Sequence, residues 1–254
     1  MGLRKEDAYQ YALCMDLTGD KFQFAVVHPE QKKIVLHESF DVQSFNRDSI
    51  EEFLSHEVLK FDFHSYSLSA GSIRNTLIPV DLFSYSKPKD IFKLNYPEPI
   101  DNLDYNRIPE LGIVNIYEVP LWIKSLFVIR FPRIKIVHRS TVLLKGIFDQ
   151  ASFSPKVHLF IEKEKFYFMI SEKSKLTYFN HFEFKELADL VYYVHFVFDQ
   201  KEYDQSKFEI NIYGKSTAWE DLKALEGFIN SEIKIADSSE KGENFILAKQ
   251  TLCV

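Results

Sequence analysis

The chain carries the same strand pattern twice. Residues 9–42 and residues 156–184 each read as three short strands separated by turn residues. The matching apolar positions are Leu13 and Met15 with Leu159 and Ile161, Phe22, Phe24 and Val26 with Phe166, Phe168 and Ile170, and Ile34 and Phe40 with Leu176 and Phe182. The offset between partners falls from 146 to 144 to 142 along these pairs. The pattern predicts a duplicated sheet in which strands align and each of the two turns shortens.

Each repeat is followed by segments that predict helix, strand, helix and strand, so the fold class is mixed α/β even if two such units arose without duplication. In the first half we expect a helix at 48–60, strands at 66–70, 76–83, 113–119 and 134–137, a helix after Pro120 and a helix at 141–153. In the second half we expect helices at 185–198 and 217–229 and strands at 208–213 and 233–236, with 245–252 open between helix and strand. Four prolines within residues 86–111 favour an ordered excursion or a mobile loop over a core element.

Composition excludes several classes of protein. The 254 residues are 46% hydrophobic and include 24 Phe and 13 Tyr, enough for a substantial core. A net charge of −6 argues against wholesale nucleic-acid or membrane binding. No run of apolar residues is long enough to cross a bilayer. The two cysteines, Cys14 and Cys253, suggest reduced thiols, and we expect a cytoplasmic protein.

Glycine is scarce, and the usual phosphate-binding loops are missing. The chain has 8 glycines, and no two of them are closer than thirteen residues. Clustered glycines let backbone N–H groups surround a phosphate, and neither GxGxxG nor GxxxxGK[ST] occurs. The eight histidines show no HExxH spacing and GxSxG is also missing, which excludes a zinc protease and a nucleophile elbow.

Two tandem βββαβαβ halves resemble the actin-like ATPase fold of actin, sugar kinases and the Hsp70 nucleotide domain. The stretch GIVNIYEVPLWIKSLFVIRFPRIKIVHRSTVLLKGIF resembles the segment that joins the lobes in pilus-assembly members of that superfamily. Over nearly its whole length the chain is similar to an uncharacterised bacterial family with this fold. The resemblance implies two actin-like (ribonuclease H-like) lobes with mixed sheets. We place them at 1–140, including the Pro-rich excursion 86–111, and at 141–254.

The resemblance also implies where nucleotide would bind in an active relative. There an aspartate at the end of the first strand supports magnesium through water, and a glycine turn takes the phosphate. Asp16 stands in that place, with Thr18 and Gly19 in the turn, but Asp20 adds a negative charge there. The turn at 162–164 has no glycine, and only Gly214 stands where the adenine motif has adjacent glycines. The nucleotide site is therefore predicted to be degenerate, with Asp16–Gly19 a hairpin turn and Gly214 a strand-end turn.

A basic segment at 121–145 is the one strong electrostatic feature of the sequence. No acidic residue occurs between Glu118 and Asp149, whereas six cations do. Such a run favours an acidic partner, an anion or RNA, and it is also compatible with plain solvated helix and strand faces. The cations assigned to a partner surface are Lys124, Arg130, Arg133, Lys135 and Arg139.

Three functions follow as hypotheses. The leading one is a cytoplasmic, non-catalytic actin-like module that binds a protein partner not identifiable from the sequence, with no cofactor expected. The alternative is a diverged ATPase or sugar-kinase-like phosphotransferase that binds ATP and Mg through Asp16, Thr18, Gly19 and Gly214. The third is RNA or anion binding through the basic segment.

Overall fold

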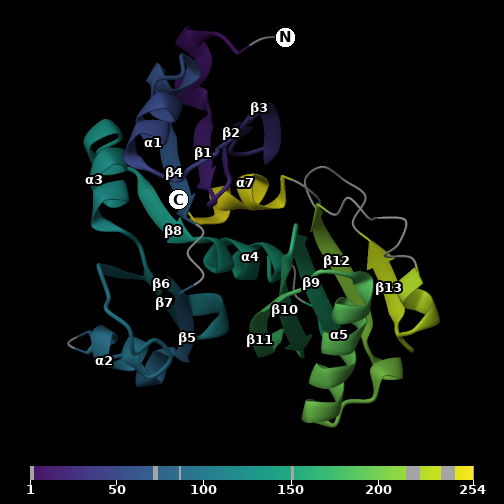
Figure 1. The fold of residues 1–254 in the computed structure, drawn as a ribbon. Coiled ribbons are helices and arrows are strands. Elements are labelled where there is room, and N and C mark those ends of the chain that lie inside the picture. Colours follow the sequence, from purple (N-terminus) through teal and green to yellow (C-terminus); the bar gives the residue numbers. More distant parts are fainter. Residues whose placement is uncertain are drawn as a thin grey trace. The chain divides into compact units, whose positions relative to one another are not determined.

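A computed structural model describes residues 3–70, 74–85, 87–149, 152–215, 224–235 and 244–253. The chain divides into two compact units: unit 1 is 1–146 together with 246–254, and unit 2 is 147–245. Each unit contains one five-stranded sheet, and unit 1 also contains a three-stranded sheet (Figure 1). The end of the chain thus belongs to unit 1, whereas the sequence-based division assigns all of 141–254 to the second lobe. That division at residue 140 stays a prediction.

The five-stranded sheet of unit 1 has the strand order β3-β2-β1-β4-β8. It is mixed, because β1 pairs antiparallel with β2 and parallel with β4. All residues of the central strand β1 are buried, because packed elements cover both faces of the sheet. The strands are β1 (Ala12–Leu17), β2 (Lys21–His28), β3 (Lys33–Asp41), β4 (Ser65–Ala70) and β8 (Lys135–His138).

Two helices, α1 (Arg47–Leu54) and α3 (Leu121–Arg130), cover one face of this sheet. Alternation along β1 sends Leu13, Met15 and Leu17 to that face, where they join one core cluster with residues of both helices. Asn46 caps α1 by accepting a hydrogen bond from the Ser49 backbone N–H at 2.9 Å. The helix ends at Leu54, earlier than the predicted residue 60, and a short 3-10 turn follows at Val58–Lys60.

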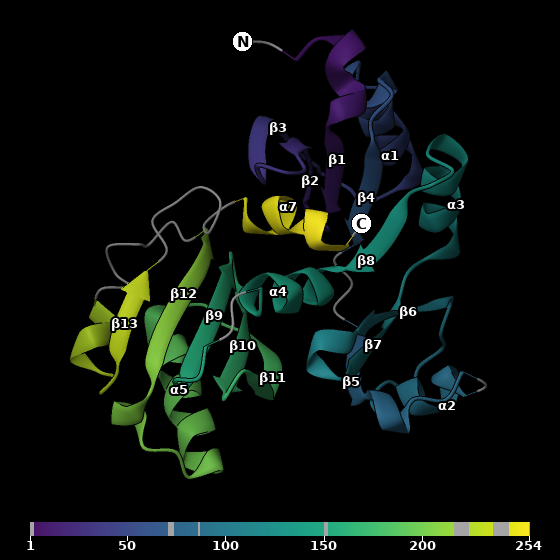
Figure 2. The same cartoon turned by 180° about the vertical axis from the view of Figure 1, so that it is seen from behind.

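The other face of the sheet is covered by the end of the chain. Ala12 and Cys14 of β1 pack with Leu247 of helix α7 (Phe245–Lys249). A 3-10 turn at Gln250–Cys253 follows, so the ambiguous segment 245–252 is helical. Figure 2 shows this C-terminal segment beside strands from the start of the chain.

The prediction for residues 86–111 is corrected by the structure. This segment forms helix α2 (Pro88–Lys93) and strand β6 (Leu103–Ile108) of an antiparallel sheet ordered β5-β7-β6. The other strands are β5 (Asn75–Pro79) and β7 (Ile113–Glu118). Phe92 packs with Val114 and Ile116, so the segment supplies core residues. Its prolines did not prevent this, because Pro88 and Pro109 occupy first positions of helical turns, where no backbone donor is needed.

Unit 2 contains a mixed sheet with the order β11-β10-β9-β12-β13. Helix α5 (Leu187–Lys201) buries Leu190, Val194 and Val197 in the core cluster of that sheet. Of the predicted helix 217–229, residues 217–223 lie outside the described residues, and Ala224–Gly227 is a 3-10 turn. The strands are β9 (Lys156–Glu162), β10 (Lys165–Glu172), β11 (Lys175–Glu183), β12 (Glu209–Lys215) and β13 (Glu232–Ile235).

The two five-stranded sheets share both strand order and register. Met15 pairs with Phe24, and Leu159 pairs with Phe168, so both partners are displaced by 144 residues. The antiparallel ladder is interrupted between Val26 and Val27 and again between Ile170 and Ser171, with the same displacement. β3 and β11 are offset by 142 residues, from Lys33 to Lys175.

This register corrects one part of the sequence alignment. Met15 corresponds to Leu159 rather than to Ile161, so the first hairpin turn has the same length in both sheets and only the second turn shortens. The sequence could not reveal the slip, because a shift of two residues along a strand keeps every side chain on the same face.

Helix α4 (Arg139–Ile147) begins two residues before the predicted start at 141, directly after β8. No helix in the described part of the chain is both long and apolar enough to span a membrane.

Candidate functional site

The end of β1 buries a carboxylate. Asp16 has no exposed surface, and alternation places it on the side of β1 opposite Met15 and Leu17. Its Oδ2 accepts a hydrogen bond from Gln23 Nε2 at 2.9 Å, across the β1–β2 pair in which the two residues are partners. A buried carboxylate requires a cation or several donors, since removing the charge from water is costly.

Arg139 supplies the cation. It is the first residue of α4 and follows His138, the last residue of β8. Its guanidinium Nη1 donates to Asp16 Oδ2 in a buried ion pair, with side-chain exposures of 5% for Arg139 and 0% for Asp16. The sequence predicts Arg139 on an exposed partner surface. The structure instead buries its side chain, and its guanidinium pairs with Asp16 inside unit 1.

A network of uncharged polar side chains surrounds the start of α4. Asn115 Nδ2 donates to the hydroxyls of Ser140 and Thr141, both at 2.9 Å, and Asn75 Nδ2 donates to Asn115 Oδ1 at 3.1 Å. Ser140 Oγ also lies 2.7 Å from His138 Nδ1. These contacts join β5 and β7 of the small sheet to α4.

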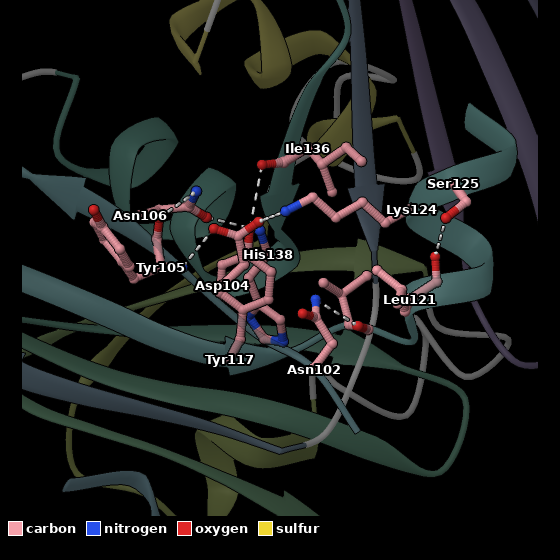
Figure 3. A network of polar contacts seen from close by, with 11 residues as sticks. Asn102, Asp104, Tyr105, Asn106, Tyr117, Leu121, Lys124, Ser125, Ile136 and His138 are labelled. Atoms are coloured by element: carbon pink, nitrogen blue, oxygen red, sulfur yellow. Dashed lines mark hydrogen bonds and ion pairs between the residues drawn. The ribbon is translucent and has the colours of Figure 1, made fainter. Parts of the chain in front are cut away.

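The same network continues toward α3, as Figure 3 shows. Asn106 Oδ1 accepts a hydrogen bond from the His138 backbone N–H at 3.0 Å, and the Tyr117 hydroxyl donates to the Ile136 carbonyl at 3.2 Å. Burial raises the pKa of Tyr117 well above its ordinary value, with Asp104 adding to the shift. Lys124 Nζ lies 2.6 Å from the Asp104 carboxylate, so β6 places an acid beside a helix whose own sequence has none.

The turn that should take phosphate in an active relative is closed by its own residues. The Thr18 backbone N–H donates to the Lys21 carbonyl at 2.8 Å, and the Thr18 hydroxyl lies 3.0 Å from Asp20 Oδ1. Gly19 has no heavy atom within 4 Å of the position of an added Cβ, and its backbone is not left-handed. These contacts agree with a hairpin turn between β1 and β2. Nucleotide contact by Thr18 or Gly19 stays a prediction.

Gly214 lies within β12, whereas a turn at the strand end was expected. It pairs with Ile161 of β9, and a Cβ at Gly214 would stand 2.1 Å from the Ile161 carbonyl oxygen. Its φ of +94° is also a value that side chains with a Cβ rarely adopt. The close approach of two backbones therefore explains this glycine without an adenine contact.

The residue in unit 2 that corresponds to Asp16 is apolar. Gln23 pairs with Asp16, and Tyr167, which is displaced from Gln23 by 144 residues, pairs with Phe160. Phe160 is 3% exposed and contacts Phe245, with ring centroids 5.8 Å apart. Glu162, at the turn 162–164, pairs with Lys165 across the hairpin.

Unit 2 also contains a buried histidine, His158, with a serine and a tyrosine as polar partners. His158 Nε2 lies 2.9 Å from Ser171 Oγ, and His158 Nδ1 lies 3.2 Å from the Tyr213 hydroxyl. Burial lowers the pKa of His158 to about 4, with Lys156 adding to the shift. Ser171 and His158 are 4% and 5% exposed, so this serine–histidine pair has no access for a substrate and serves as a satisfied core contact.

Sequence reasoning found Asp16 but missed its neighbours. Gln23 and Asn115 gave no local signal, because a single amide in a strand has no distinguishing spacing. The available clue was the cation at 139, two residues after the predicted strand 134–137. Within the described ranges, no group of three or more His, Cys, Asp or Glu is arranged to hold a metal ion.

Comparison with solved structures places this arrangement in the actin-like ATPase fold. A Bacteroides thetaiotaomicron protein described as having an actin-like ATPase fold and unknown function matches with a TM-score of 0.87 and 20% identity, over 100% of both chains. The PilM–PilN type IV pilus biogenesis complex matches with a TM-score of 0.59 and 11% identity, over 95% of this chain and 98% of that chain. The cytoplasmic domain of EpsL, an inner membrane component of the Vibrio cholerae type II secretion system, matches with a TM-score of 0.51 and 10% identity, over 96% of this chain and 94% of that chain.

The fold class is therefore α/β and actin-like, with two mixed five-stranded sheets consistent with ribonuclease H-like lobes. Residues 3–230 match the family described as protein of unknown function (DUF3822), and the chain belongs to that family. The search of curated proteins finds no match.

Proposed function

We propose that this chain is an actin-like module that acts by binding a protein partner and that its nucleotide site is degenerate. The observation that carries the proposal is the buried ion pair between Asp16 and Arg139. In this fold the Asp16 position is the one expected to organise magnesium. Here an arginine of the same chain already compensates its charge.

The residues present do not fit a magnesium–nucleotide complex. Magnesium keeps several waters and needs carboxylate oxygens that water can reach, whereas Asp16 has no exposed surface. Its Oδ2 already accepts from Gln23 as well as from Arg139. A magnesium ion beside Asp16 would also face the Arg139 guanidinium, and two cations in a buried site repel. We therefore derive no nucleotide chemistry for this chain.

The second half supports the same proposal. If the two sheets arose by duplication, as the shared order and register favour, the counterpart of Asp16 is Phe160. An aromatic ring packed against Phe245 offers no ligand to a metal ion or to its waters. The acidic position is thus compensated in one half and replaced in the other.

Partner binding is one use of this fold among the solved structures that the chain resembles. The PilM–PilN structure is a complex, and EpsL is a component of a secretion system. For this chain a protein partner, a cytoplasmic location and a contact surface at 121–145 and in the Pro-rich segment 86–111 are parts of the proposal. Arg139 is omitted from that surface, and Lys124, Arg130, Arg133 and Lys135 are retained.

Thermal unfolding with and without millimolar ATP and magnesium tests the nucleotide part of the proposal. We expect no change of Tm for the wild-type chain. A ligand present at a hundred times its Kd would add about 2.7 kcal/mol, or roughly 5–10 °C for a chain of this size. A shift of that size that disappears in Asp16→Asn would overturn the proposal and favour the phosphotransferase alternative. Equilibrium dialysis with labelled ATP provides the same comparison without relying on folding stability.

A further inference from the structure

Helix α3 is apolar on its exposed side as well as on its buried side. Leu121, Val128 and Ile129 are 55%, 41% and 80% exposed, and Ser125 between them is also exposed. These four residues, the α3 stripe, follow the i, i+4, i+7, i+8 spacing of one helix face. The Ser125 hydroxyl donates to the Leu121 carbonyl at 2.8 Å (Figure 3), so the stripe carries no unsatisfied side-chain donor.

The carboxyl end of α3 carries uncompensated positive charge. Arg130, Arg133 and Lys135, the basic end, are all exposed. The Arg130 guanidinium is oriented by the Leu59 carbonyl at 3.3 Å and lies 5.7 Å from the Phe131 ring centroid. Among the residues that the structure describes, Arg133 and Lys135 form no ion pair with an acid. An exposed cationic group in a chain of net charge −6 attracts acidic groups selectively.

Acidic residues lie beside the amino end of α3. Asp101 Oδ2 accepts a hydrogen bond from the Leu121 backbone N–H at 3.2 Å, and Asp104 pairs with Lys124. In the described part of this surface, cations without an acidic partner therefore lie only at the carboxyl end of α3, so the two ends of the surface differ in charge. A partner would have to match an apolar row with acidic groups at one end of it.

We propose that the α3 stripe and the basic end bind a helical protein segment whose apolar face ends in a cluster of carboxylates. The proposal rests on the proposed partner-binding function and names the chemistry of the partner. The stripe spans nine residues of helix from Leu121 to Ile129, about 12 Å, so two to three turns of a partner helix would cover it. A row of branched side chains along a helix is the surface into which the ridge of a second helix packs.

A protein helix fits this surface better than a lipid bilayer. Helices that lie on membranes present a long apolar face with aromatic anchors and cations along the polar side. The α3 stripe is short, is interrupted by Ser125 and has its unpaired cations only at one end. The net charge of the chain also opposes an anionic membrane.

A synthetic peptide tests the inference. The probe is a fluorescein-labelled helical peptide of about four turns, with leucines at i, i+3, i+4 and i+7 and glutamates at one end. Two comparison peptides have the same composition in scrambled order, or lysine in place of glutamate. Fluorescence anisotropy is measured with the full-length wild-type chain, with Ile129→Asp and with Arg133→Glu/Lys135→Glu. The matched control is Lys5→Glu, which reverses an exposed cation of the 3-10 helix Lys5–Gln10, outside the proposed contact surface.

We expect the patterned acidic peptide to bind at least tenfold more tightly than either comparison peptide. Both α3 variants should weaken it about tenfold or more, and Lys5→Glu should not. Equal binding of the scrambled peptide, or unchanged binding by the α3 variants, would overturn the inference. The inference would also be overturned if the wild type bound vesicles of phosphatidylcholine and phosphatidylglycerol and the α3 variants lost that binding. That result would assign the surface to lipid. The ATP measurement on the same proteins separates this failure from failure of the proposed function, because the α3 variants leave Asp16 and Arg139 intact.

Discussion

The Arg139 guanidinium donates a hydrogen bond to the Asp16 carboxylate, 123 positions earlier in the sequence, and both side chains are buried. The contact joins the end of β1 to the start of α4. In the proposed function, this contact compensates the carboxylate that would otherwise be available to magnesium.

Arg139→Ala should lower the free energy of unfolding by about 3–5 kcal/mol, because it leaves the Asp16 carboxylate buried without its cation. Urea unfolding followed by circular dichroism measures the loss. The control is Arg133→Ala, which removes an exposed cation nearby and should change stability by less than about 0.5 kcal/mol. In the double variant Asp16→Ala/Arg139→Ala the two losses should not add. Additive losses would show that the ion pair contributes no coupling energy.

Gly214→Ala should be strongly destabilising, by about 2–4 kcal/mol or more. The added methyl group would stand 2.1 Å from the Ile161 carbonyl oxygen, at a φ of +94°. Gly19→Ala serves as the control, since its Cβ meets nothing within 4 Å and its backbone is not left-handed. A shift in Tm measures both. Similar small shifts for the two variants would contradict the close approach of β9 and β12.

Stability should fall as the pH is lowered from about 6.5 to about 4. The pKa of His158 is lowered to about 4 in the folded chain, while an unfolded histidine titrates near 6.5. The unfolded state therefore binds more protons between these values, and the folded state loses up to about 3 kcal/mol as the pH falls through that range. Lys156 lowers this pKa and Glu209 raises it, so the two charged groups act in opposite directions.

Urea midpoints measured between pH 7.5 and pH 4 for the wild type and His158→Gln give the contribution of this residue. The variant keeps polar contacts available to Ser171 and Tyr213 but cannot titrate in this range. The wild type should lose more stability than His158→Gln over the acid range. Parallel curves would remove His158 as a source of the pH dependence.

Gln250→Ala should cost about 2–3 kcal/mol, although Gln250 lies near the end of the chain. Its Oε1 accepts a hydrogen bond from Ser67 Oγ at 2.6 Å, and its Nε2 donates to the Met15 carbonyl at 2.9 Å. All of these atoms are in the core of unit 1, so truncation leaves buried polar groups without a partner. Thr251→Ala, one residue further along, should cost less than about 1 kcal/mol. Thermal unfolding that does not distinguish the two would show that the C-terminal turn is dispensable.

The duplicated pattern and the α/β class could be predicted because hydrophobic periodicity is local. Phe22, Phe24 and Val26 alternate with polar or second-face residues whatever lies beside them, and the same holds for Phe166, Phe168 and Ile170. The Pro-rich segment was misjudged for a related reason. Proline signals a break in regular structure, but whether a strand such as β6 forms between two breaks depends on the neighbouring strand β7.

The sequence by itself determined the two repeats of three strands and most of the elements that follow them, and it placed Asp16 at the end of the first strand. Only the tertiary structure decided what that aspartate does. Its partner Arg139 is distant in the chain, and on sequence it belonged to an exposed basic surface together with Arg130 and Arg133. Local pattern cannot distinguish a buried arginine from an exposed one, because the difference is made by a carboxylate that the folded sheet brings to it.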